Sequence, residues 1–382
     1  MKEGWEYKKI GEVSSLIADG DWIESKHQSD DGIRLIQTGN IGRGVFKAKE
    51  DKPHFISEAT FKELGCTEIF EGDCLISRLP DPVGRSCLIP NISKRMITAV
   101  DCTILRFKKE LTPAFFVYYT QSIRYNKEIE GNVTGSTRKR ISRKNLEKVV
   151  VPIPPLSEQQ HIVEELDLLS SIIEKKKAQL NELDNLAQSL FYEMFGDPIT
   201  NEKGWEVKKL KDVSTLLNGR AYKQDELLSE GKYKVLRVGN FFTNSSYYYS
   251  DLELEDNKYC DNGDLLFAWS ASFGAFIWQG GKVIYHYHIW KVLFDETTLN
   301  KLFYQYLLNI MTTSFMNDVH GIGMVHLTKV GMEQYMLPIP PIDLQQQFAS
   351  KIETIEHQKE LIKQSIKEVE TLFNSRMDYY FN

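Results

Sequence analysis

Cysteine is scarce in this sequence of 382 residues. The five cysteines are odd in number and no two form a Cys-x-x-Cys pair, which argues against a disulfide framework and against a cysteine-rich zinc site. No stretch approaches the roughly 18–20 consecutive apolar residues of a membrane span, and the first residues lack the apolar core of a signal peptide. We therefore expect buried, reduced thiols, no membrane partner and a cytoplasmic location.

Signatures of catalysis are missing as well. The sequence has no phosphate-binding Gly-x-x-x-x-Gly-Lys-Ser/Thr loop, no Gly-x-Gly-x-x-Gly, no His-Glu-x-x-His zinc helix and no Asn/Asp-Pro-Pro-aromatic motif. His286 and His288 flank Tyr287 on an expected strand, but no cysteine or acidic cluster completes a metal site, so we expect a packed pair. We predict no catalytic residue, metal ligand or cofactor in this chain.

The net charge of −6 hides an uneven distribution. Residues 1–150 carry 25 Lys and Arg against 21 Asp and Glu, a balance of +4, whereas residues 151–200 carry 3 against 9, a balance of −6. A chain of this kind can bind DNA through a local basic surface while other parts supply the acidity.

The sequence repeats itself. Gly4-Trp5-Glu6 returns as Gly204-Trp205-Glu206 at an offset of 200, and Gly72-Asp73 returns as Gly263-Asp264 at 191. Pro152-Ile153-Pro154-Pro155 returns as Pro338-Ile339-Pro340-Pro341 at 186. The chain is therefore predicted to be two copies of one unit, with residues lost from the middle of the second.

Each copy is predicted to be α+β and to be followed by one long helix. Strands are expected at 103–107 and 282–285, and helices at 114–125 and 299–315. The prolines, which interrupt strand ladders and helices, mark a stiff joint before each long helix. The predicted parts are a first globular domain (1–151), a joint and helix (152–200), a second globular domain (201–337), and a second joint and helix (338–382).

The long helices are expected to pair as a coiled coil, because their apolar residues alternate in steps of four and three. Ser157 is the expected N-cap of the first helix, with Gln160 at the capping-box position. The stripe also holds Lys176 and Lys359, which would fix the register. The predicted pairing residues are Ile162, Leu166, Leu169, Ile173, Leu180, Leu183, Leu190, Ile352, Ile355, Ile362, Ile366, Val369 and Phe373.

A basic segment at 134–144 favours nucleic-acid binding. Five cations fall within residues 138–144, after a Thr-Gly-Ser-Thr stretch that lets a backbone approach closely. Lysine and arginine neutralise phosphates or bind guanine in the major groove. The corresponding segment of the second copy, 321–329, keeps glycine but has little charge.

Two further pairs of loops occupy matching places in the copies, around 41–44 and 241–245, and around 77–85 and 268–274. Ordinary hairpin turns remain an alternative for both pairs. The candidate DNA-binding residues from all three regions are Arg43, Arg78, Arg85, Thr134, Gly135, Ser136, Thr137, Arg138, Lys139, Arg140, Arg143, Lys144, Asn244, Trp269, Ser270, Ser272, Met324, His326 and Lys329.

Taken in this order and given twice, these motifs resemble the specificity subunits of Type I restriction-modification enzymes. The resemblance covers the whole chain and rests on the duplicated Gly-Trp-Glu opening, the strand at 34–40 that ends in Gly-Asn, the Thr-Gly-Ser-Thr stretch, the two proline joints and the long helices.

The resemblance implies two tandem target-recognition domains, each reading half of a bipartite double-stranded DNA sequence, and an antiparallel pair of helices that docks the modification (methyltransferase) subunits. It places S-adenosylmethionine, ATP and magnesium on partner subunits, including the restriction subunit. Two alternatives remain open at this point, namely a coiled-coil scaffold that does not bind DNA and a self-contained DNA-modifying enzyme.

Overall fold

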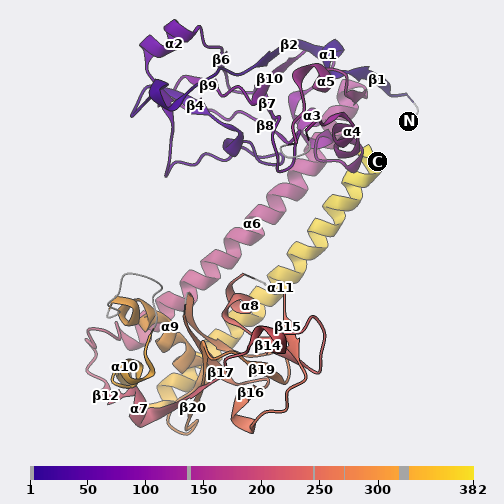
Figure 1. Cartoon of the computed structure of the whole chain (residues 1–382). Coiled ribbons are helices and arrows are strands. Elements are labelled where there is room, and N and C mark those ends of the chain that lie inside the picture. The colour runs from indigo at the N-terminus through magenta and orange to yellow at the C-terminus, as the bar shows by residue number, and fades with distance from the viewer. Residues whose placement is uncertain (1–3, 136–138, 244–245, 271, 318–326) are drawn as a thin grey trace. The chain divides into compact units, whose positions relative to one another are not determined.

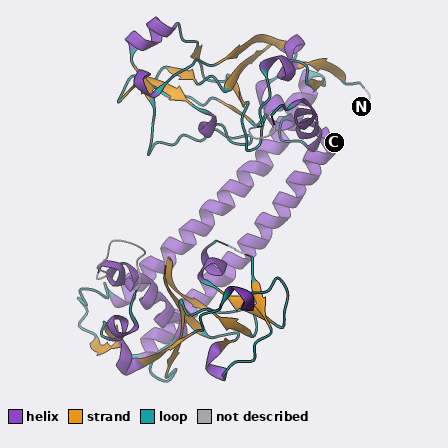
Figure 2. Ribbon diagram, viewed as in Figure 1, coloured by secondary structure: helices purple, strands orange, loops and turns teal. Residues whose placement is uncertain are grey.

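A computed structural model of the chain describes residues 4–135, 139–243, 246–270, 272–317 and 327–382. The chain divides into two units, one formed by residues 1–177 with 364–382 and the other by residues 178–363. Both units combine sheets with short helices, and each contains a stretch of both long helices (Figure 2).

The first unit holds eleven of the described strands in three sheets. The strands are β1 (Glu6–Lys9), β2 (Ser14–Asp19), β3 (Gln28–Ser29), β4 (Ile33–Ile36), β5 (Phe55–Ile56), β6 (Glu68–Ile69), β7 (Cys74–Ser77), β8 (Ser86–Leu88), β9 (Met96–Thr98), β10 (Cys102–Phe107) and β11 (Val150–Ile153). Its shorter helices are α1 (Ile10–Val13), α2 (Glu58–Leu64), α3 (Pro113–Tyr119), α4 (Ile123–Asn132) and α5 (Arg143–Leu146).

The second unit repeats this plan. Its described strands are β12 (Glu206–Lys209), β13 (Ser214–Asn218), β14 (Tyr233–Leu236), β15 (Tyr248–Ser250), β16 (Tyr259–Cys260), β17 (Leu265–Ser270), β18 (Ser272–Ile277), β19 (Val283–Tyr285), β20 (Ile289–Phe294) and β21 (Met336–Ile339). Its shorter helices are α7 (Leu210–Val213), α8 (Val238–Phe242), α9 (Lys301–Asn317) and α10 (Lys329–Glu333).

The strand orders show the duplication directly. The sheet β2-β10-β7-β8 of the first unit corresponds to β13-β20-β17-β18 of the second, and the ribbon β1-β11 corresponds to β12-β21. In the remaining sheets, β4 pairs in parallel with β9 as β14 does with β19. The predicted fold class of two tandem α+β domains is thereby confirmed.

A glycine holds the same close approach in both units. A β-carbon added to Gly20 would lie 2.3 Å from the Thr98 carbonyl oxygen, and one added to Gly219 would lie 2.3 Å from that of Tyr285. Any larger residue would force two backbone segments apart. These glycines follow β2 and β13, so each copy closes this crossing in the same way.

The helix predicted at 114–125 is wrong as a single element. Helix α3 ends at Tyr119, and α4 begins at Ile123 after Ser122 has capped it by accepting from the Tyr125 backbone N–H. Apolar residues continue through the break, so periodicity alone concealed it. The second unit has one unbroken helix here, α9.

The proline joints also differ from expectation. Pro152 lies inside β11, where it pairs opposite Tyr7 in a two-stranded ribbon, a place in which an edge strand tolerates a missing N–H. Helix α6 begins at Leu156, one residue before the expected cap Ser157. Gln160, expected in a capping box, instead bonds to Glu164.

A buried glutamine ties each joint to its unit. Gln159 donates to the carbonyl oxygens of Glu110 and Pro154 at 2.8 and 2.9 Å and accepts from the Thr112 N–H at 2.8 Å. Gln345, 186 residues later, makes the same set of bonds in the second unit. Both glutamines are fully buried.

The two long helices, α6 (Leu156–Phe195) and α11 (Ile342–Phe381), have 40 residues each (Figure 1). Inside the second unit they run antiparallel, because Asp184 of α6 is paired with Lys359 while the later Phe191 packs on the earlier Phe348. Every predicted pairing residue is buried or half-buried. Of the two stripe lysines, Lys359 is ion-paired and 15% exposed, whereas Lys176 is only half-buried.

Candidate nucleic-acid interface

Three loops of the first unit meet at one hollow of about 670 Å³. Arg43 comes from the loop between β4 and β5, residues 80–83 from the loop between β7 and β8, and Gly135 and Lys139 from the basic loop after α4. The sequence indicated these loops as three separate candidates. The structure brings them to a single concave surface.

The side chains at the hollow carry both signs of charge. Arg43 and Lys139 are exposed cations, while Asp81 and Glu130 supply carboxylates to the same wall. Cations neutralise phosphates and bind guanine, and carboxylates accept from the amino group of cytosine. The hollow therefore offers both backbone and base-edge chemistry.

Arg85 lies inside the protein, 9% exposed, and fastens the first two loops together. Its guanidinium donates to the carbonyl oxygens of Thr38, Ile41, Leu79 and Pro82 at 2.7–2.9 Å. Burial lowers the pKa of this guanidinium from its ordinary value. Arg85 was predicted to contact DNA, but the structure uses its donors to shape the loops.

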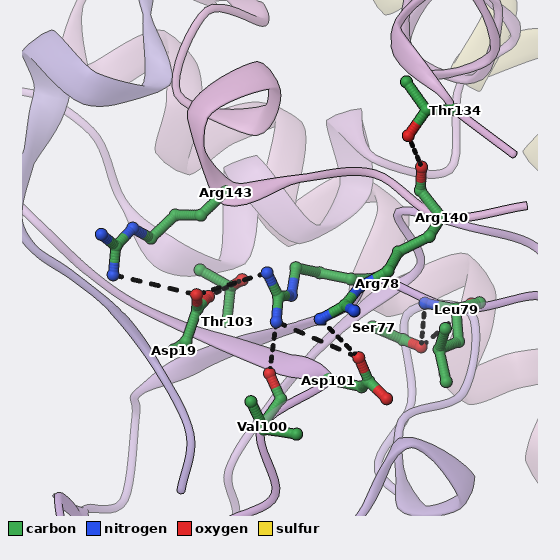
Figure 3. A network of polar contacts seen from close by, with 10 residues as sticks. All are labelled: Asp19, Ser77, Arg78, Leu79, Val100, Asp101, Thr103, Thr134, Arg140 and Arg143. Carbon is green, nitrogen blue, oxygen red and sulfur yellow. Dashed lines mark hydrogen bonds and ion pairs between the residues drawn. The ribbon is translucent and has the colours of Figure 1, made fainter. Parts of the chain in front are cut away.

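Arg78 is also buried, at 5% exposure, and forms the centre of a charged network (Figure 3). Its Nη2 donates to the Val100 carbonyl oxygen at 2.5 Å, and its Nη1 lies 3.3 Å from Asp19 Oδ2. Asp101 Oδ1 lies 4.0 Å from Arg78 Nη2 and 2.8 Å from Arg140 Nη2. The predicted DNA contact Arg78 thus sits beneath the basic loop.

The network contains more positive than negative charge. Arg143 completes it, with Nη1 3.8 Å from Asp19 Oδ2, so three guanidinium groups share two carboxylates. Burial lowers the pKa of Arg78, Asp19 opposes that shift and Arg140 adds to it. The half-exposed Arg140 and Arg143 remain within reach of solvent at the rim.

The basic loop is closed at its base. The backbones of Thr134 and Arg140 exchange two hydrogen bonds of 2.9 Å, and Ser142 then caps α5 by accepting from the Asn145 N–H. Exposed side chains along the loop and α5 are therefore presented from a fixed frame. Of the predicted residues, Thr134, Gly135, Lys139, Arg140, Arg143 and Lys144 are exposed, whereas Ser136, Thr137 and Arg138 lie outside the described residues.

The matching place in the second unit is aromatic. Trp269 donates from Nε1 to the Tyr287 carbonyl oxygen at 2.9 Å and stacks on Trp290 at 5.3 Å between ring centroids. Ser270 is buried and Ser272 half-buried. The exposed Lys329 lies 3.7 Å from Glu333, and the predicted Asn244, Met324 and His326 lie outside the described residues.

The sequence predicts that His286 and His288 lie on one strand, but in the structure both lie beyond the end of that strand. Strand β19 ends at Tyr285, and Tyr287 and His288 form the turn that leads into β20. His286 stacks on Tyr222, and its burial, together with His288, lowers its pKa to about 4. Among the residues described, no group of three or more His, Cys, Asp or Glu could hold a metal ion.

Sequence reasoning missed the two carboxylates, Asp19 and Asp101, that organise the basic loop. Asp19 precedes Gly20, and the second copy has Asn218 before Gly219, so a repeated polar-glycine pair marks this crossing. That repetition could have directed attention to Asp19. Asp101 had no such signal, because the residue in the corresponding place of the second unit, His288, is not acidic.

Each unit has a groove where α6 and α11 meet its other elements. The grooves measure about 910 and 960 Å³. Tyr118 and Glu174 line the first, and Tyr306 and Glu360 line the second at offsets of 188 and 186. The repeat therefore builds one kind of groove twice.

In the described part of the chain, no helix is long and apolar enough to cross a membrane.

Comparison with known proteins agrees with this duplicated plan. The sequence matches the family model of the Type I restriction modification DNA specificity domain over residues 2–185 and again over 202–371. It is 26% identical to the Type I restriction enzyme MjaIX specificity subunit of Methanocaldococcus jannaschii, over 93% of this chain and 87% of that one. It is 25% identical to the EcoKI specificity subunit of Escherichia coli, over 70% of this chain and 61% of that one.

Solved structures show the same fold. A chain from a type I restriction-modification system superposes with a TM-score of 0.62 at 16% identity, covering all of this chain and 98% of that one. The S subunit of such a system from M. genitalium gives a TM-score of 0.54 at 12% identity, covering 98% and 95% of the two chains.

Proposed function

Because the chain belongs to the Type I restriction modification DNA specificity domain family, we propose that each unit reads one half of a bipartite DNA target for catalytic partner subunits. The observation that carries this proposal is the meeting of three separately predicted loops at one hollow in the first unit. The second unit repeats the frame beneath those loops, which supports a second reading surface.

The electrostatics of the hollow suit double-stranded DNA. Arg43 and Lys139 are exposed and could meet phosphates or guanine edges, and the exposed Asp81 and Glu130 could accept from base amino groups. Cations that met phosphates alone would bind DNA without discrimination, because phosphate contacts carry no sequence information, whereas contacts of cations with guanine and of carboxylates with base amino groups depend on the sequence. The mixture of charges therefore supports sequence-specific binding.

The paired grooves support docking of two equivalent partners. Each contains a tyrosine and a glutamate at matching places, so a partner that recognises one groove would recognise the other. We assign these grooves to methyltransferase subunits, with S-adenosylmethionine bound by those partners. ATP and magnesium would be bound by a restriction subunit, and this chain would supply the DNA sequence specificity.

Mapping of methylated sites tests the proposal. Genomic DNA from cells with and without this chain is sequenced for methylated bases, with the methyltransferase subunits present in both. We expect a motif of two short specific parts separated by unspecified bases, which disappears without the chain. A continuous motif, or the same motif without the chain, would contradict the proposal.

A second measurement separates this function from self-contained catalysis. The purified chain is incubated with DNA, S-adenosylmethionine and magnesium, first alone and then with the methyltransferase subunits. Methyl transfer is expected only in the second mixture. Turnover by the chain alone would show that it carries its own active site.

A further inference from the structure

Arg78 and Trp269 occupy the same position in the two copies. They lie 191 residues apart, the offset already set by the Gly-Asp pairs that precede β7 and β17. Arg78 follows the last residue of β7, and Trp269 is the penultimate residue of β17. Sequence comparison alone would treat an arginine and a tryptophan as unrelated.

The two residues nevertheless make the same three connections. The Arg78 N–H donates to the Asp101 carbonyl oxygen at 2.9 Å, and the Trp269 N–H donates to that of His288 at 3.1 Å. Their carbonyl oxygens accept from the N–H groups of Ile141 and Leu327, at 3.2 and 3.3 Å.

The third connection uses the side chains. Arg78 Nη2 donates to the Val100 carbonyl oxygen at 2.5 Å, and Trp269 Nε1 donates to the Tyr287 carbonyl oxygen at 2.9 Å. Each side chain thus connects the end of its own strand, β7 or β17, to the turn that precedes the neighbouring strand of the sheet, β10 or β20. Each also lies beside the segment that enters a capped helix, α5 or α10, through Ile141 or Leu327.

The surroundings of the two anchors differ in chemistry. Asp19 and Asp101 face Arg78 and also hold Arg140 and Arg143 of the basic loop. Around Trp269 the rings of Tyr287, His288 and Trp290 lie at centroid distances of 6.0, 5.1 and 5.3 Å. An ionic anchor in one copy is replaced by an aromatic anchor in the other.

We propose that Arg78 and Trp269 are equivalent positioning residues, each of which fixes the DNA-reading segment of its own unit. The proposal rests on the proposed function, because it concerns how the two half-sites are read. Neither side chain needs to touch a base. Each holds the backbone segment that carries predicted DNA-binding residues. These are Lys139, Arg140 and Arg143 in the first unit and Lys329 in the second.

This arrangement explains how one frame can serve two half-sites. The backbone connections are kept, so the reading segment enters at the same place in both units. The side-chain environment changes from charged to aromatic, so the segments themselves are free to differ in sequence. Disturbing one anchor should therefore affect one half-site only.

The test is a base-preference measurement on the complex of the full chain with its methyltransferase subunits, using a library randomised at both half-sites. Arg78→Lys keeps the positive charge but cannot bond Val100 and Asp19 together. We expect discrimination at one half-site to fall about tenfold, because a displaced side chain no longer distinguishes the correct base from the others. Trp269→Phe should do the same at the other half-site.

Matched variants separate positioning from a general loss of stability. Arg106→Lys breaks a two-bonded ion pair with Asp73 in the first unit, and Trp278→Phe removes an Nε1 bond to the Gly281 carbonyl oxygen in the second. Both should leave base preference unchanged. If Arg78→Lys does not assemble, Asp101→Asn keeps the side-chain shape and should relax the same half-site.

The outcomes distinguish the two levels of the argument. If the wild-type complex shows no bipartite preference, the proposed function fails. If the wild type is bipartite but the anchor variants behave like their matched controls, or relax the same half-site, the positioning role is overturned. Relaxation of opposite half-sites by Arg78→Lys and Trp269→Phe supports it.

Discussion

Glu165 and Arg376 are 211 residues apart in the sequence and form a two-bonded ion pair in the first unit. Arg376 donates from Nε and Nη2 to the two carboxylate oxygens of Glu165 at 2.5 and 2.8 Å, and the Tyr380 hydroxyl donates to the same carboxylate. These bonds lower the pKa of Glu165. The last turns of α11 are thereby fastened to the first turns of α6.

This pair should contribute measurably to stability. Glu165→Gln and Arg376→Gln are each expected to lower the free energy of unfolding by a small but measurable amount, because both side chains are partly shielded but still meet solvent. A double-mutant cycle on the full chain should give a coupling of similar size. The matched control is Lys177→Gln, which removes a local ion pair with Glu174. Both side chains of that pair are half-exposed or more, so its loss should barely change the free energy of unfolding. A coupling indistinguishable from zero would contradict the prediction.

The long helices were the part of the fold most accessible from sequence. Heptad spacing predicts which face of a helix is buried, and Ile162 and Ile352, which lie on the predicted stripe, are both fully buried. The duplication was equally accessible, because Gly-Trp-Glu and Pro-Ile-Pro-Pro recur in fixed order.

The interface was less accessible, because residue type does not reveal depth. Arg78 and Arg85 lie in a basic, glycine-containing segment typical of a DNA-binding loop, yet both are buried and bonded to carbonyl oxygens. Their role depends on which distant carbonyl groups the fold brings within reach. The start of α4 likewise depends on a hydrogen bond, which Ser122 accepts from the Tyr125 N–H, rather than on periodicity.

The hollow should give DNA binding a strong salt dependence. Arg43→Gln and Lys139→Gln each remove one exposed cation from it. If both cations meet phosphates, each variant should lower the slope of log affinity against log salt by about 0.9. Titrations of the full complex at several salt concentrations measure this slope. Lys62→Gln, an exposed cation on α2, is the control and should not change it, and equal slopes for all three variants would argue against contact at the hollow.

His286 should make the stability of the chain depend on pH. Burial and the neighbouring His288 lower its pKa to about 4, below the ordinary value near 6.5. Because the folded state resists protonation there, the stability is fully present above about pH 6.5 and is lost progressively as the pH falls toward 4. Urea unfolding at pH 7, 5.5 and 4.5 should show that His286→Asn has a shallower loss than the wild type. Parallel curves for the two proteins would contradict the assignment.

The paired helices should determine the spacing of the two half-sites if they set the distance between the reading units. If the antiparallel register defined by Asp184 and Lys359 continues along the helices, residues 175–181 lie opposite residues 362–368. Removing both segments deletes one heptad from each helix and keeps the apolar stripe in phase. It shortens the pair by about 10 Å, or about three base pairs of DNA. Selection from a library with variable spacers should show a preferred spacer shorter by about that amount and unchanged half-sites. Deletion from α6 alone is the control, because it leaves the stripe in phase but makes α6 one heptad shorter than α11, so that the pairs Glu165–Arg376 and Asp184–Lys359 can no longer form in one register. An unchanged spacer in the double deletion would show that something other than these helices sets the distance.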